Sequence, residues 1–515
     1  MNEFIQQPLY YTMIWTSIFK DLQQISPDDQ SFVKKIPAPI PKGVKRLRLQ
    51  CRPRSESIFA EVDIESRFQE YIDHPWVDEA KSQIIRENFR ESFSRKIHKN
   101  WSLLVFDNEG RFRGRWDPSF SDWKEIGEYE SSCGFEDGLI GEGVWHFHLS
   151  TTTKKVSTQI QIDIEAALDV PENGASCYKK PLHLFEADAN ADNQLAWRLG
   201  ELHEHSLRSA GRFTPEDTLS IYQEIGYNFL ALTDHDAPPL KALQRSFSIA
   251  VLRGQEIRWP FGHALLLGMR DWMPPNADEN PDHVGELIHE THVQGGLFGI
   301  LHPFAIQAGK GESLWTIDSL NWGKVDLLEI WSGSWRQRFP EILKSFDLWD
   351  KLLNRGHHIF GFCGKGSGEP ANAEILEQSP KTAVLSEGLS EGSLLSALKL
   401  GHFYATCEPA ISLHIESDYG EAFMGDELHL PANKPFVLYI TISQLDGAYL
   451  RIKTNQGIYC EMPASSKKET QLKFYERAGN EPRWFRVEIY RYGRPVDDLL
   501  AFSNPIFVRP LSSVQ

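Results

Sequence analysis

Two stretches of the chain alternate apolar and polar residues over short runs that are separated by Gly, Asn and Asp turns. The first extends from Val44 to about Ile164 and includes the run Lys45–Gln50. The second begins at Ile411 and includes the run Phe436–Ile442. Because successive side chains of a strand point to opposite faces, this alternation predicts short strands with one buried face. Each stretch is therefore expected to form a β-sandwich-like domain.

The region between these stretches combines continuous apolar runs with helical segments. Thr214–Asp217 has the composition of a helix start, with a capping Thr, a Pro in the first position and acids in the first turn. Further helices are expected at Pro281–Gln294 and Phe346–Arg355, and buried strands at Val325–Trp331 and Ile359–Phe362. This alternation of strands and helices favours a parallel α/β barrel.

The length of 515 residues is enough for several domains. Near the beginning, aromatic and polar positions are mixed and predict a helix around Tyr11–Leu22. The Pro-rich run from Ile36 to Gly43 is typical of a linker. We therefore expect an arm and linker at residues 1–37, a β-sandwich at 38–178, the α/β domain at 179–410 and a second β-sandwich at 411–515.

Composition narrows the classes of function. The formal net charge of −17 disfavours nonspecific binding to nucleic acid or to an anionic membrane. The sequence contains no basic-then-apolar signal and no apolar run of membrane-spanning length, so a cytoplasmic protein is expected, with oligomer formation left open. The six cysteines are scattered without a C-x-x-C pair, which is not the pattern of a disulfide framework or a structural zinc site.

Several of the predicted strands end in side chains that can bind a metal ion. His203 and His205 form an H-x-H pair, which places both imidazoles on one side of an extended strand. The next apolar run, Phe229–Thr233, is followed by Asp234 and His235. Neutral imidazoles and carboxylates are the ligands that zinc, iron and manganese need. Further candidates in comparable positions are Glu256, His263 and His302.

The order H-x-H, T-D-H, G-x-E, G-H and H-P along the chain resembles that of the PHP (polymerase and histidinol phosphatase) metallohydrolases. With a β-sandwich on each side, the arrangement is similar to the CehA/McbA-like branch of that superfamily. The stretch Gly401–Thr406 and the ending that begins at Asn504 add to the likeness, which covers nearly all of residues 40–510. The resemblance implies an α/β plus β architecture, in which a distorted (β/α)7 PHP barrel is flanked by two β-sandwich-like domains.

The resemblance also implies ligands for two metal ions. One ion would be bound by His203, His205 and Glu256. A second would share Glu256 and add His263 and His302. Three protein ligands that leave a coordination position open are typical of catalytic metal sites, since a water can be activated there. One or two divalent ions per chain are therefore expected, with zinc, manganese and iron as the candidates.

A third ion, which PHP sites usually hold, would retain only His235 in this chain. The positions where the family has the other ligands of this ion hold Ala210 and Gly368, and Gly366 stands where the first ion would have an Asp ligand. The resemblance therefore implies a degraded third metal site beside one or two retained ones. Cys363 lies next to the degraded loop; it is a substitute ligand or, as we expect, a buried thiol.

Three side chains are candidates for catalytic roles. His235 or Asp234 would orient the substrate or carry a proton, and Asp234 has the alternative of accepting a hydrogen bond from a ligand imidazole. Lys365, in the Gly-rich loop, would offer a positive charge to a phosphate or to a developing anion. The alternative for Lys365, which we favour, is a solvated lysine. Glu329, in a buried strand, is a candidate for a group that supports the ligands from outside.

Together these residues support a metal-dependent hydrolase of phosphoesters or related esters that acts through a metal-activated water on a small-molecule substrate. Phosphorylated compounds are among the candidates. The alternative is a catalytically degenerate PHP protein that serves as a ligand-binding or assembly module, which the lost ligands favour and the retained ones oppose. A nucleic-acid enzyme is a third hypothesis, which the acidic balance and the lack of a basic aromatic groove disfavour.

Overall fold

In the computed structural model the chain forms two compact units. One combines Met1–Val62 with Ile97–Lys180, and the other combines Asp63–Lys96 with Pro181–Gln515. No helix among the described residues is long and apolar enough to cross a membrane. The structure describes residues 13–25, 33–54, 58–59, 78–79, 81–87, 101–116, 122–132, 134–151, 156–168, 182–183, 194–240, 242–243, 246–259, 262–273, 281–305, 315, 320–366, 379–445, 447–463, 466–492 and 497–511.

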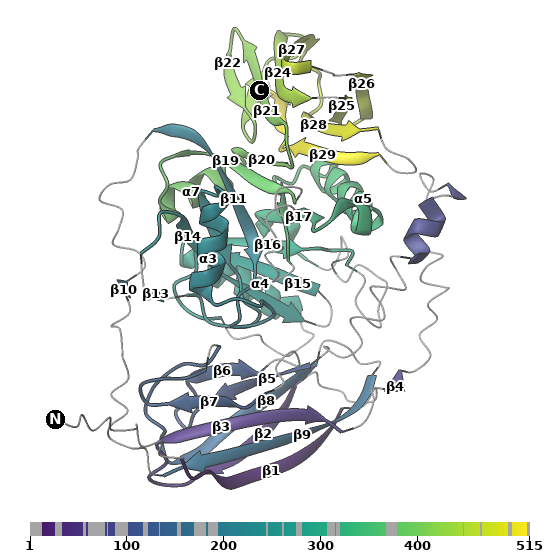
Figure 1. The fold of residues 1–515 in the computed structure, drawn as a ribbon. Coiled ribbons are helices and arrows are strands. Elements are labelled where there is room, and N and C mark those ends of the chain that lie inside the picture. Colours follow the sequence, from purple (N-terminus) through teal and green to yellow (C-terminus); the bar gives the residue numbers. More distant parts are fainter. Residues whose placement is uncertain are drawn as a thin grey trace, which may run out of the picture. The chain divides into compact units, whose positions relative to one another are not determined.

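The first unit is a β-sandwich of two antiparallel sheets (Figure 1). Its strands are β1 (Thr16–Ile25), β2 (Val33–Ile40), β3 (Arg46–Pro53), β4 (Ile58–Phe59), β5 (Trp101–Phe106), β6 (Phe112–Trp116), β7 (Lys124–Gly127), β8 (Gly143–Thr151) and β9 (Val156–Ala167). One sheet has the order β1-β9-β3-β7, with β4 beside β9, and the other has the order β2-β8-β5-β6. Buried apolar side chains of both sheets, such as Leu47, Ile162, Leu103 and Phe147, form one core.

The predictions of a helix around Tyr11–Leu22 and of a linker from Ile36 to Gly43 are wrong, because β1 and β2 of this sandwich occupy these segments. β1 pairs with β9 through a ladder that shifts between Ser17 and Phe19. The shift breaks the strict alternation of apolar positions, which hides the strand in the sequence. In β2 the burial alternates, with Ile36, Ala38 and Ile40 inward and the two prolines outward. β2 is an edge strand, where a proline costs no ladder hydrogen bond. Residues 11–12 of the expected helix lie outside the described residues.

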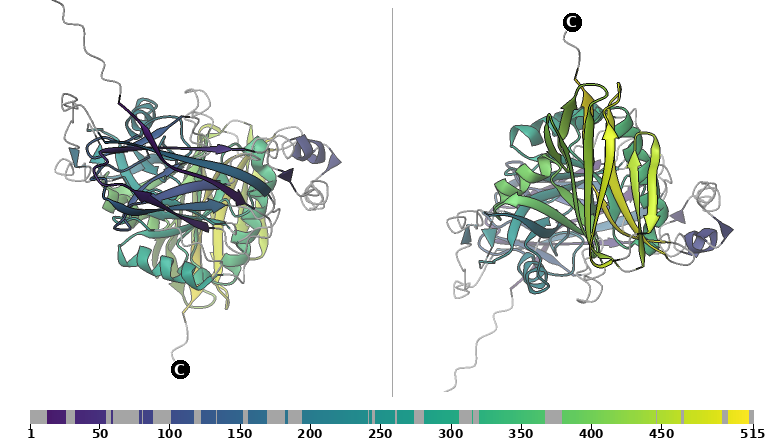
Figure 2. Two further views of the ribbon diagram at one scale, coloured as in Figure 1. Left: turned by 90° about the horizontal axis from the view of Figure 1, so that it is seen from below. Right: turned by 90° about the horizontal axis from the view of Figure 1, so that it is seen from above.

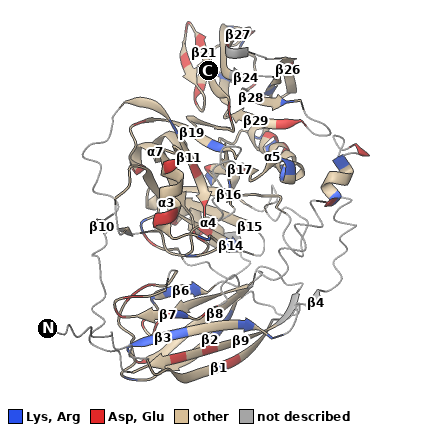
Figure 3. Cartoon of the chain, viewed as in Figure 1, with Lys and Arg blue, Asp and Glu red and all other residues tan. Residues whose placement is uncertain are grey.

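Ion pairs cover one face of this unit. Figure 3 marks Lys and Arg positions in blue along β3 and acidic positions in red on neighbouring strands. Arg46 pairs with Glu125 at 2.9 Å, and Arg52 pairs with Asp163 at 2.5 Å. Such cross-strand pairs stabilise an outer sheet face, each by about 0.2–1 kcal/mol. These arginines of β3 are therefore paired with carboxylates of the neighbouring strands.

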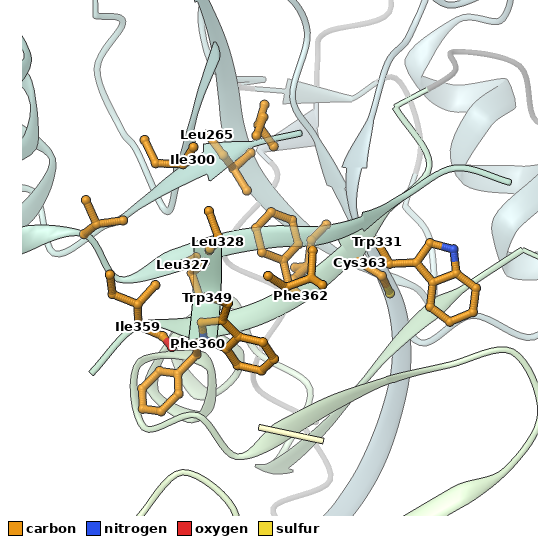
Figure 4. Packing of buried hydrophobic residues seen from close by; sticks show 14 of the residues in the cluster. Leu265, Ile300, Leu327, Leu328, Trp331, Trp349, Ile359, Phe360, Phe362 and Cys363 are labelled. Atoms are coloured by element: carbon orange, nitrogen blue, oxygen red, sulfur yellow. Dashed lines mark hydrogen bonds between the residues drawn. The ribbon is translucent and has the colours of Figure 1, made fainter. Parts of the chain in front are cut away.

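The segment 63–96, within the range expected for the first sandwich, belongs by its contacts to the second unit. Among its described residues, 81–87 are helical, and Ile85 is buried in the large core of the second unit. This core also includes Leu265, Leu327 and Trp349, which Figure 4 shows in close packing. A local sequence pattern cannot assign such an insertion, because the core that receives it lies elsewhere in the chain.

The second unit is built on one long, mixed sheet. The strands of its first part are β11 (Leu195–Glu204), β12 (Phe229–Leu232), β14 (Ala250–Trp259), β15 (Gly262–Leu267), β16 (Leu297–Leu301), β17 (Leu327–Ser332), β18 (Phe360–Gly364), β19 (Lys381–Glu387) and β20 (Phe403–Thr406). They follow the order β18-β17-β16-β15-β14-β12-β11-β19-β20. β11, β12 and β14 are parallel, as are β16, β17 and β18, and β15 joins the two sets by antiparallel pairing.

Helices connect several of these strands, as the sequence predicts. They are α3 (Pro215–Glu224), α4 (Pro281–Val293), α5 (Trp335–Asn354) and α7 (Glu391–Lys399). Thr214 caps α3 by accepting from the Asp217 amide. Small elements complete this part: β10 (Leu182–His183) paired with β13 (Ala242–Leu243), and a 3-10 turn at Trp322–Lys324.

The sheet curls enough for β18 to reach β11. The Gly366 amide, just beyond β18, donates to the carbonyl oxygen of His203 at 2.9 Å. No strand ladder joins β18 to β11 among the described residues, so the pairing by itself does not establish a closed (β/α)7 barrel. The contact nevertheless brings the ends of β11 and β18 together, and the candidate site lies there.

The last part of the chain is a second β-sandwich, which is continuous with the long sheet (Figures 1 and 2). Its strands are β21 (Ala410–Ser417), β22 (Gly420–Phe423), β23 (Glu427–Leu430), β24 (Pro435–Leu445), β25 (Ala448–Thr454), β26 (Gly457–Pro463), β27 (Ser466–Arg477), β28 (Arg483–Arg491), β29 (Asp498–Ser503) and β30 (Ile506–Pro510). One sheet has the order β22-β21-β24-β27. The other extends β20 through β29, β28, β25 and β26, and the two sheets share a core with Ile415, Ile440 and Val487.

A buried side chain ties this sandwich to the strand that leads into the site. Asn504 accepts a hydrogen bond from the Gly361 amide at 2.7 Å and donates to the carbonyl oxygens of Gly361 at 3.2 Å and Phe403 at 2.9 Å. An amide side chain that is buried with all these groups satisfied fixes the relative positions of the segments it joins. β18 is thus held in place by a residue about 140 positions further along the chain.

Candidate metal centre

Three parallel strands bring four of the candidate ligands to one end of the sheet. His203 lies in β11 and His205 follows directly after it, His235 comes shortly after β12, and Glu256 lies in β14. An isolated bridge between His235 and Glu256 continues the pairing beyond β12. Because β11, β12 and β14 run in the same direction, their final residues meet at one edge of the sheet. The antiparallel pairing of β15 and β16 adds His263, and His302 directly follows β16.

The carboxylate of Glu256 lies at the centre of five imidazoles. Its Oε2 is 2.8 Å from His203 Nε2 and 3.2 Å from both His205 Nε2 and His235 Nε2. Its Oε1 is 2.6 Å from His263 Nδ1 and 3.9 Å from His302 Nε2. Imidazole nitrogens around a shared carboxylate are the donor set that zinc, manganese and iron bind. The structure thus brings together all six residues expected as ligands.

The donor atoms fall into two groups that are compact enough to hold an ion. His203, Glu256 and His302 form one, His205, His235 and Glu256 form the other, and the donor atoms within each lie within 4.8 Å of one another. Ligands at about 2.0–2.1 Å from a tetrahedral ion lie roughly 3.3 Å apart, which is close to most of the contacts around Glu256. Glu256 is shared, as the resemblance implied, but the histidines are grouped differently from the expected pairs.

The second ring nitrogens of two histidines offer a further test of fit. The Nδ1 atoms of His205 and His235 are buried and have no hydrogen-bond partner among the described residues. A buried imidazole nitrogen without a partner costs about 1–3 kcal/mol, so these rings are not placed for packing alone. Since no described group contacts either Nδ1 atom, both rings can present a nitrogen lone pair to an ion. The residues fit one or two divalent ions.

The cluster has a buried side and an accessible side. His203, His205 and Glu256 are at most 2% exposed, whereas the side chains of His235, His263 and His302 are 12–15% exposed. Of the six side chains, these three histidines are the most exposed, and they form the edge of the cluster nearest to solvent. We call this edge, made of His235, His263 and His302, the accessible edge.

Electrostatics favours the metal-binding form of two of these histidines. Burial lowers the pKa of His235 well below its usual range, and the positive charge of Arg258 adds to the lowering. Burial also lowers the pKa of His302, with contributions from His263 and Arg338. In His203, burial lowers the pKa, but the charges of Glu329 and Glu256 outweigh this effect and raise it. Neutral imidazole is the form that binds metal. The lowered pKa values favour the neutral form of His235 and His302, whereas His203, with its raised pKa, would have to release a proton when an ion binds.

Glu329, on β17, orients two of the donors, as the sequence suggested. Its Oε1 lies 3.0 Å from His203 Nδ1, and its Oε2 accepts the backbone N–H of His302 at 2.7 Å. A carboxylate on the far nitrogen of a ligand imidazole sets its tautomer and ring orientation. The His302 backbone has φ = 24°, a strained value for a non-glycine residue, and the bond from Glu329 helps to hold it.

Substitution of Glu329 by glutamine is expected to weaken metal binding by about 10–100-fold, because the neutral amide supports the His203 imidazole less well. The dissociation constant should be measured by titration of the metal-free protein with zinc and manganese. Glu290→Gln, at an exposed position of α4, is the matched control. Equal affinities in the wild type and in Glu329→Gln would contradict this role for Glu329.

Asp234 is fully occupied in holding the chain that follows His205. Its Oδ1 accepts from the Ser206 amide at 2.8 Å and the Ser209 hydroxyl at 2.7 Å, and its Oδ2 accepts from the Ser206 hydroxyl at 2.7 Å. Among the described residues no imidazole donates to Asp234. The geometry therefore favours a positioning role over proton transfer. Ala210 lies in the turn that these bonds fix.

The Gly-rich loop after β18 packs directly on the cluster. A Cβ added at Gly364 would lie 2.6 Å from both Glu329 Oε1 and His203 Cβ, and one at Gly366 would lie 3.0 Å from His203 Cε1. Only glycine fits at 364, and a side chain at 366 would enter the site. Gly368 lies outside the described residues. Lys365 is buried, so the expectation of a solvated lysine is wrong: its backbone amide donates to Glu201 Oε1 at 3.2 Å, which draws the residue into the interior.

Sequence reasoning missed Glu201, which lies beneath the cluster. Its Oε1 accepts the His203 amide at 2.8 Å as well as the Lys365 amide. Burial and the nearby charge of Glu204 raise the pKa of Glu201 to about 8. Glu201 and His203 lie in β11 and His205 follows it, so the three stand at alternate positions, and the period of two that drew attention to the histidines also indicated this carboxyl group.

Asp236 and Arg258 form an ion pair next to the cluster, which the sequence analysis also missed. Asp236 has φ = 51°, which is uncommon for a residue with a side chain. Its carboxylate accepts the Arg258 amide at 3.0 Å and lies 3.4 Å from the Arg258 Nε and Nη2 atoms. Arg258 is two residues beyond Glu256 on β14 and directly opposite His263 on β15, so it lies beside the donor groups.

Comparisons with known proteins do not assign the chain to a family. No family model matches it, and no curated protein matches it. A solved two-domain protein from Bacteroides vulgatus, described as containing a predicted PHP-like metal-dependent phosphoesterase, is 15% identical, covers 61% of this chain and 96% of its own, and gives a TM-score of 0.35.

Two further solved structures are similar over other extents. The C-terminal domain of Wzt is 15% identical and covers 21% of this chain and 75% of its own, with a TM-score of 0.16. A β-glucuronidase from Bacteroides uniformis is 8% identical and covers 96% of this chain and 61% of its own, also with a TM-score of 0.16. These TM-scores are too low to support an argument about fold or function, which therefore depends on the residues of the site.

Proposed function

We propose that the protein is a divalent-metal-dependent hydrolase of phosphoesters or related esters, built on a PHP-type (β/α)7 domain of the CehA/McbA-like branch. The observation that carries the proposal is the pair of donor groups that share Glu256, with His203 and His302 on one side and His205 and His235 on the other. Bound ions would activate a water molecule and stabilise the negative charge that develops on the ester. Zinc, manganese and iron all suit this donor set.

The protein's own residues would hold the reacting groups at the accessible edge. Water attacks phosphorus or a carbonyl carbon, the bond to the leaving oxygen breaks, and that oxygen takes a proton. His263 lies in neither donor group and faces the edge, so it is the imidazole best placed to exchange that proton. Asp234 and Glu329 fix the ligands from behind, and the burial of His203 and Glu256 keeps bulk water away from the far side.

A ligand-binding protein without turnover is the second candidate. The position of Gly366 favours it, because a Cβ there would lie 3.0 Å from His203 Cε1, and the resemblance implies an aspartate ligand of the first ion at this position. Its absence reduces the number of ligands, and a weakened centre is compatible with binding alone. Five clustered imidazoles oppose this candidate, since a buried polar cluster without a ligand is costly.

Removal of the metal tests the proposal. Protein purified without chelator is expected to contain about one or two equivalents of a divalent metal by plasma mass spectrometry, and treatment with EDTA should abolish hydrolysis of p-nitrophenyl phosphate until metal is restored. Protein that binds less than about a tenth of an equivalent, even after loading, would favour the second candidate. Activity that is insensitive to EDTA, with metal shown to be gone, would also contradict the proposal.

A further inference from the structure

Each of the two donor groups has one guanidinium group beside it. Arg258 accompanies the group that contains His235, since it follows Glu256 by two residues on β14 and pairs opposite His263. Arg338, in the first turn of α5, lies near the loop that packs on His203, which belongs to the other donor group. A Cβ added at Gly333 would lie 3.7 Å from Arg338 Nε and 3.5 Å from the carbonyl oxygen of Lys365, which belongs to the loop that packs on His203.

Among the described residues, neither guanidinium makes a short hydrogen bond with a carboxylate. Arg258 is 9% exposed, and both of its side-chain contacts with Asp236 are 3.4 Å long. Arg338 is 30% exposed, and its Nη1 lies 3.7 Å from Glu341 Oε2, beyond hydrogen-bonding distance. The planar guanidinium offers several N–H donors in a fork that matches the oxygens of a phosphate group. With respect to the described residues, both side chains thus retain N–H donors for an anion.

The two guanidinium groups place fixed positive charge near the donor groups, and this favours the approach of an anion. α5 adds to the positive potential, because its N-terminal end lies next to Gly333.

We propose that Arg258 and Arg338 form an anion receptor that selects a terminal, doubly charged phosphate over a singly charged phosphodiester. This inference rests on the proposed function and specifies its substrate class as phosphate monoesters. A monoester presents three non-bridging oxygens and about two negative charges, enough for both arginines in addition to the metal ions. A diester has one charge and fewer free oxygens, and its second substituent would occupy the space beside one of the guanidinium groups.

Anion binding without turnover tests the inference. Metal-loaded protein would be titrated by calorimetry with inorganic phosphate and with dimethyl phosphate, a singly charged analogue. The wild type is expected to bind phosphate more tightly by at least about tenfold, and Arg338→Gln is expected to lose most of this preference. Arg338→Lys keeps the charge without the fork and should be intermediate. Arg336→Gln, which removes an exposed arginine two positions earlier on α5, is the matched control.

A kinetic comparison separates recognition from a merely structural role. For Arg338→Gln, kcat/KM for p-nitrophenyl phosphate should fall at least about tenfold more than kcat/KM for bis-p-nitrophenyl phosphate. Arg258→Gln serves as the second variant and should show the same asymmetry. An equal loss for both substrates, or an unchanged preference for phosphate in variants that still carry wild-type amounts of metal, overturns the inference and leaves the hydrolase intact. Wild-type protein that binds no metal overturns both.

Discussion

Replacement of Glu256 by glutamine is expected to remove the bound metal and to reduce ester hydrolysis by more than about a hundredfold, since loss of a supporting residue alone costs about 10–100-fold. Glu256 contacts all five imidazoles and belongs to both donor groups, so no other side chain in the cluster can take over its charge. The amide has nearly the same shape as the carboxylate. Loss of metal would therefore reflect the lost charge and not a change in packing.

Metal content and activity of Glu256→Gln should be measured on the same preparation, with circular dichroism to verify folding. Glu286→Gln, an exposed position of α4, provides the matched control and should retain wild-type values. Full metal stoichiometry in Glu256→Gln would contradict the assignment of Glu256 as the shared ligand. Normal metal content with no activity would retain the metal centre and assign Glu256 to the chemistry instead.

Replacement of Asp350 by asparagine is expected to destabilise the second unit by about 2–4 kcal/mol, because it leaves a buried arginine without its main counter-charge. Arg486, on β28, is fully buried, and its Nη2 lies 2.7 Å from Asp350 Oδ1 on α5. Its guanidinium also lies over the rings of Phe346 and Trp349, 4.9 Å from each centroid. Glu488 still pairs with Arg486, which keeps the expected loss below that of a wholly unpaired charge.

The measurement is urea denaturation of the wild type and Asp350→Asn, with Asp498→Asn as the matched control. Asp498 pairs with the exposed Arg336, and loss of such a surface pair costs at most about 1 kcal/mol. Equal stabilities of Asp350→Asn and the wild type at neutral pH would show that the buried pair does not contribute net stability.

The same carboxylate predicts a dependence of stability on pH. Burial by itself would raise the pKa of Asp350, but the positive charges of Arg486 and Lys453 lower it below its ordinary value. A group whose pKa is lower in the folded state binds fewer protons there than in the unfolded chain. The stabilisation from Asp350 is therefore complete above about pH 4, near the pKa of an unfolded Asp, and disappears as the pH falls through the folded-state pKa. The difference in stability between the wild type and Asp350→Asn should therefore shrink on acidification below about pH 4.

Local sequence patterns predicted some residues of the candidate site and missed others. His203, His205, His235 and His302 stand at or just after the ends of apolar runs, and the structure gathers them at one edge. Glu201 escaped notice although it has the same parity as the two histidines of its strand. Arg338 could not be found, because its place beside the donors depends on where α5 begins relative to β18. Whether these side chains bind metal stays a prediction.

The strands β1 and β2, near the beginning of the chain, were not predicted from the sequence. The prolines of β2 pointed to a linker, yet an edge position next to β8 makes them acceptable in a strand. The irregular ladder of β1 removed the alternation on which the prediction depended. In both cases the deciding factor was the partner strand, which a local pattern does not contain.

The sequence by itself determined the two β-sandwich patterns, the strand and helix segments between them, and the order of the histidines along the chain, because burial on one face imposes a period on neighbouring residues. Only the tertiary structure decided which of these residues meet. Glu329 reaches His203 across 126 positions, and Asp350 reaches Arg486 across 136. Such contacts depend on the order and curvature of strands in the sheet, and that order is fixed when the whole core closes.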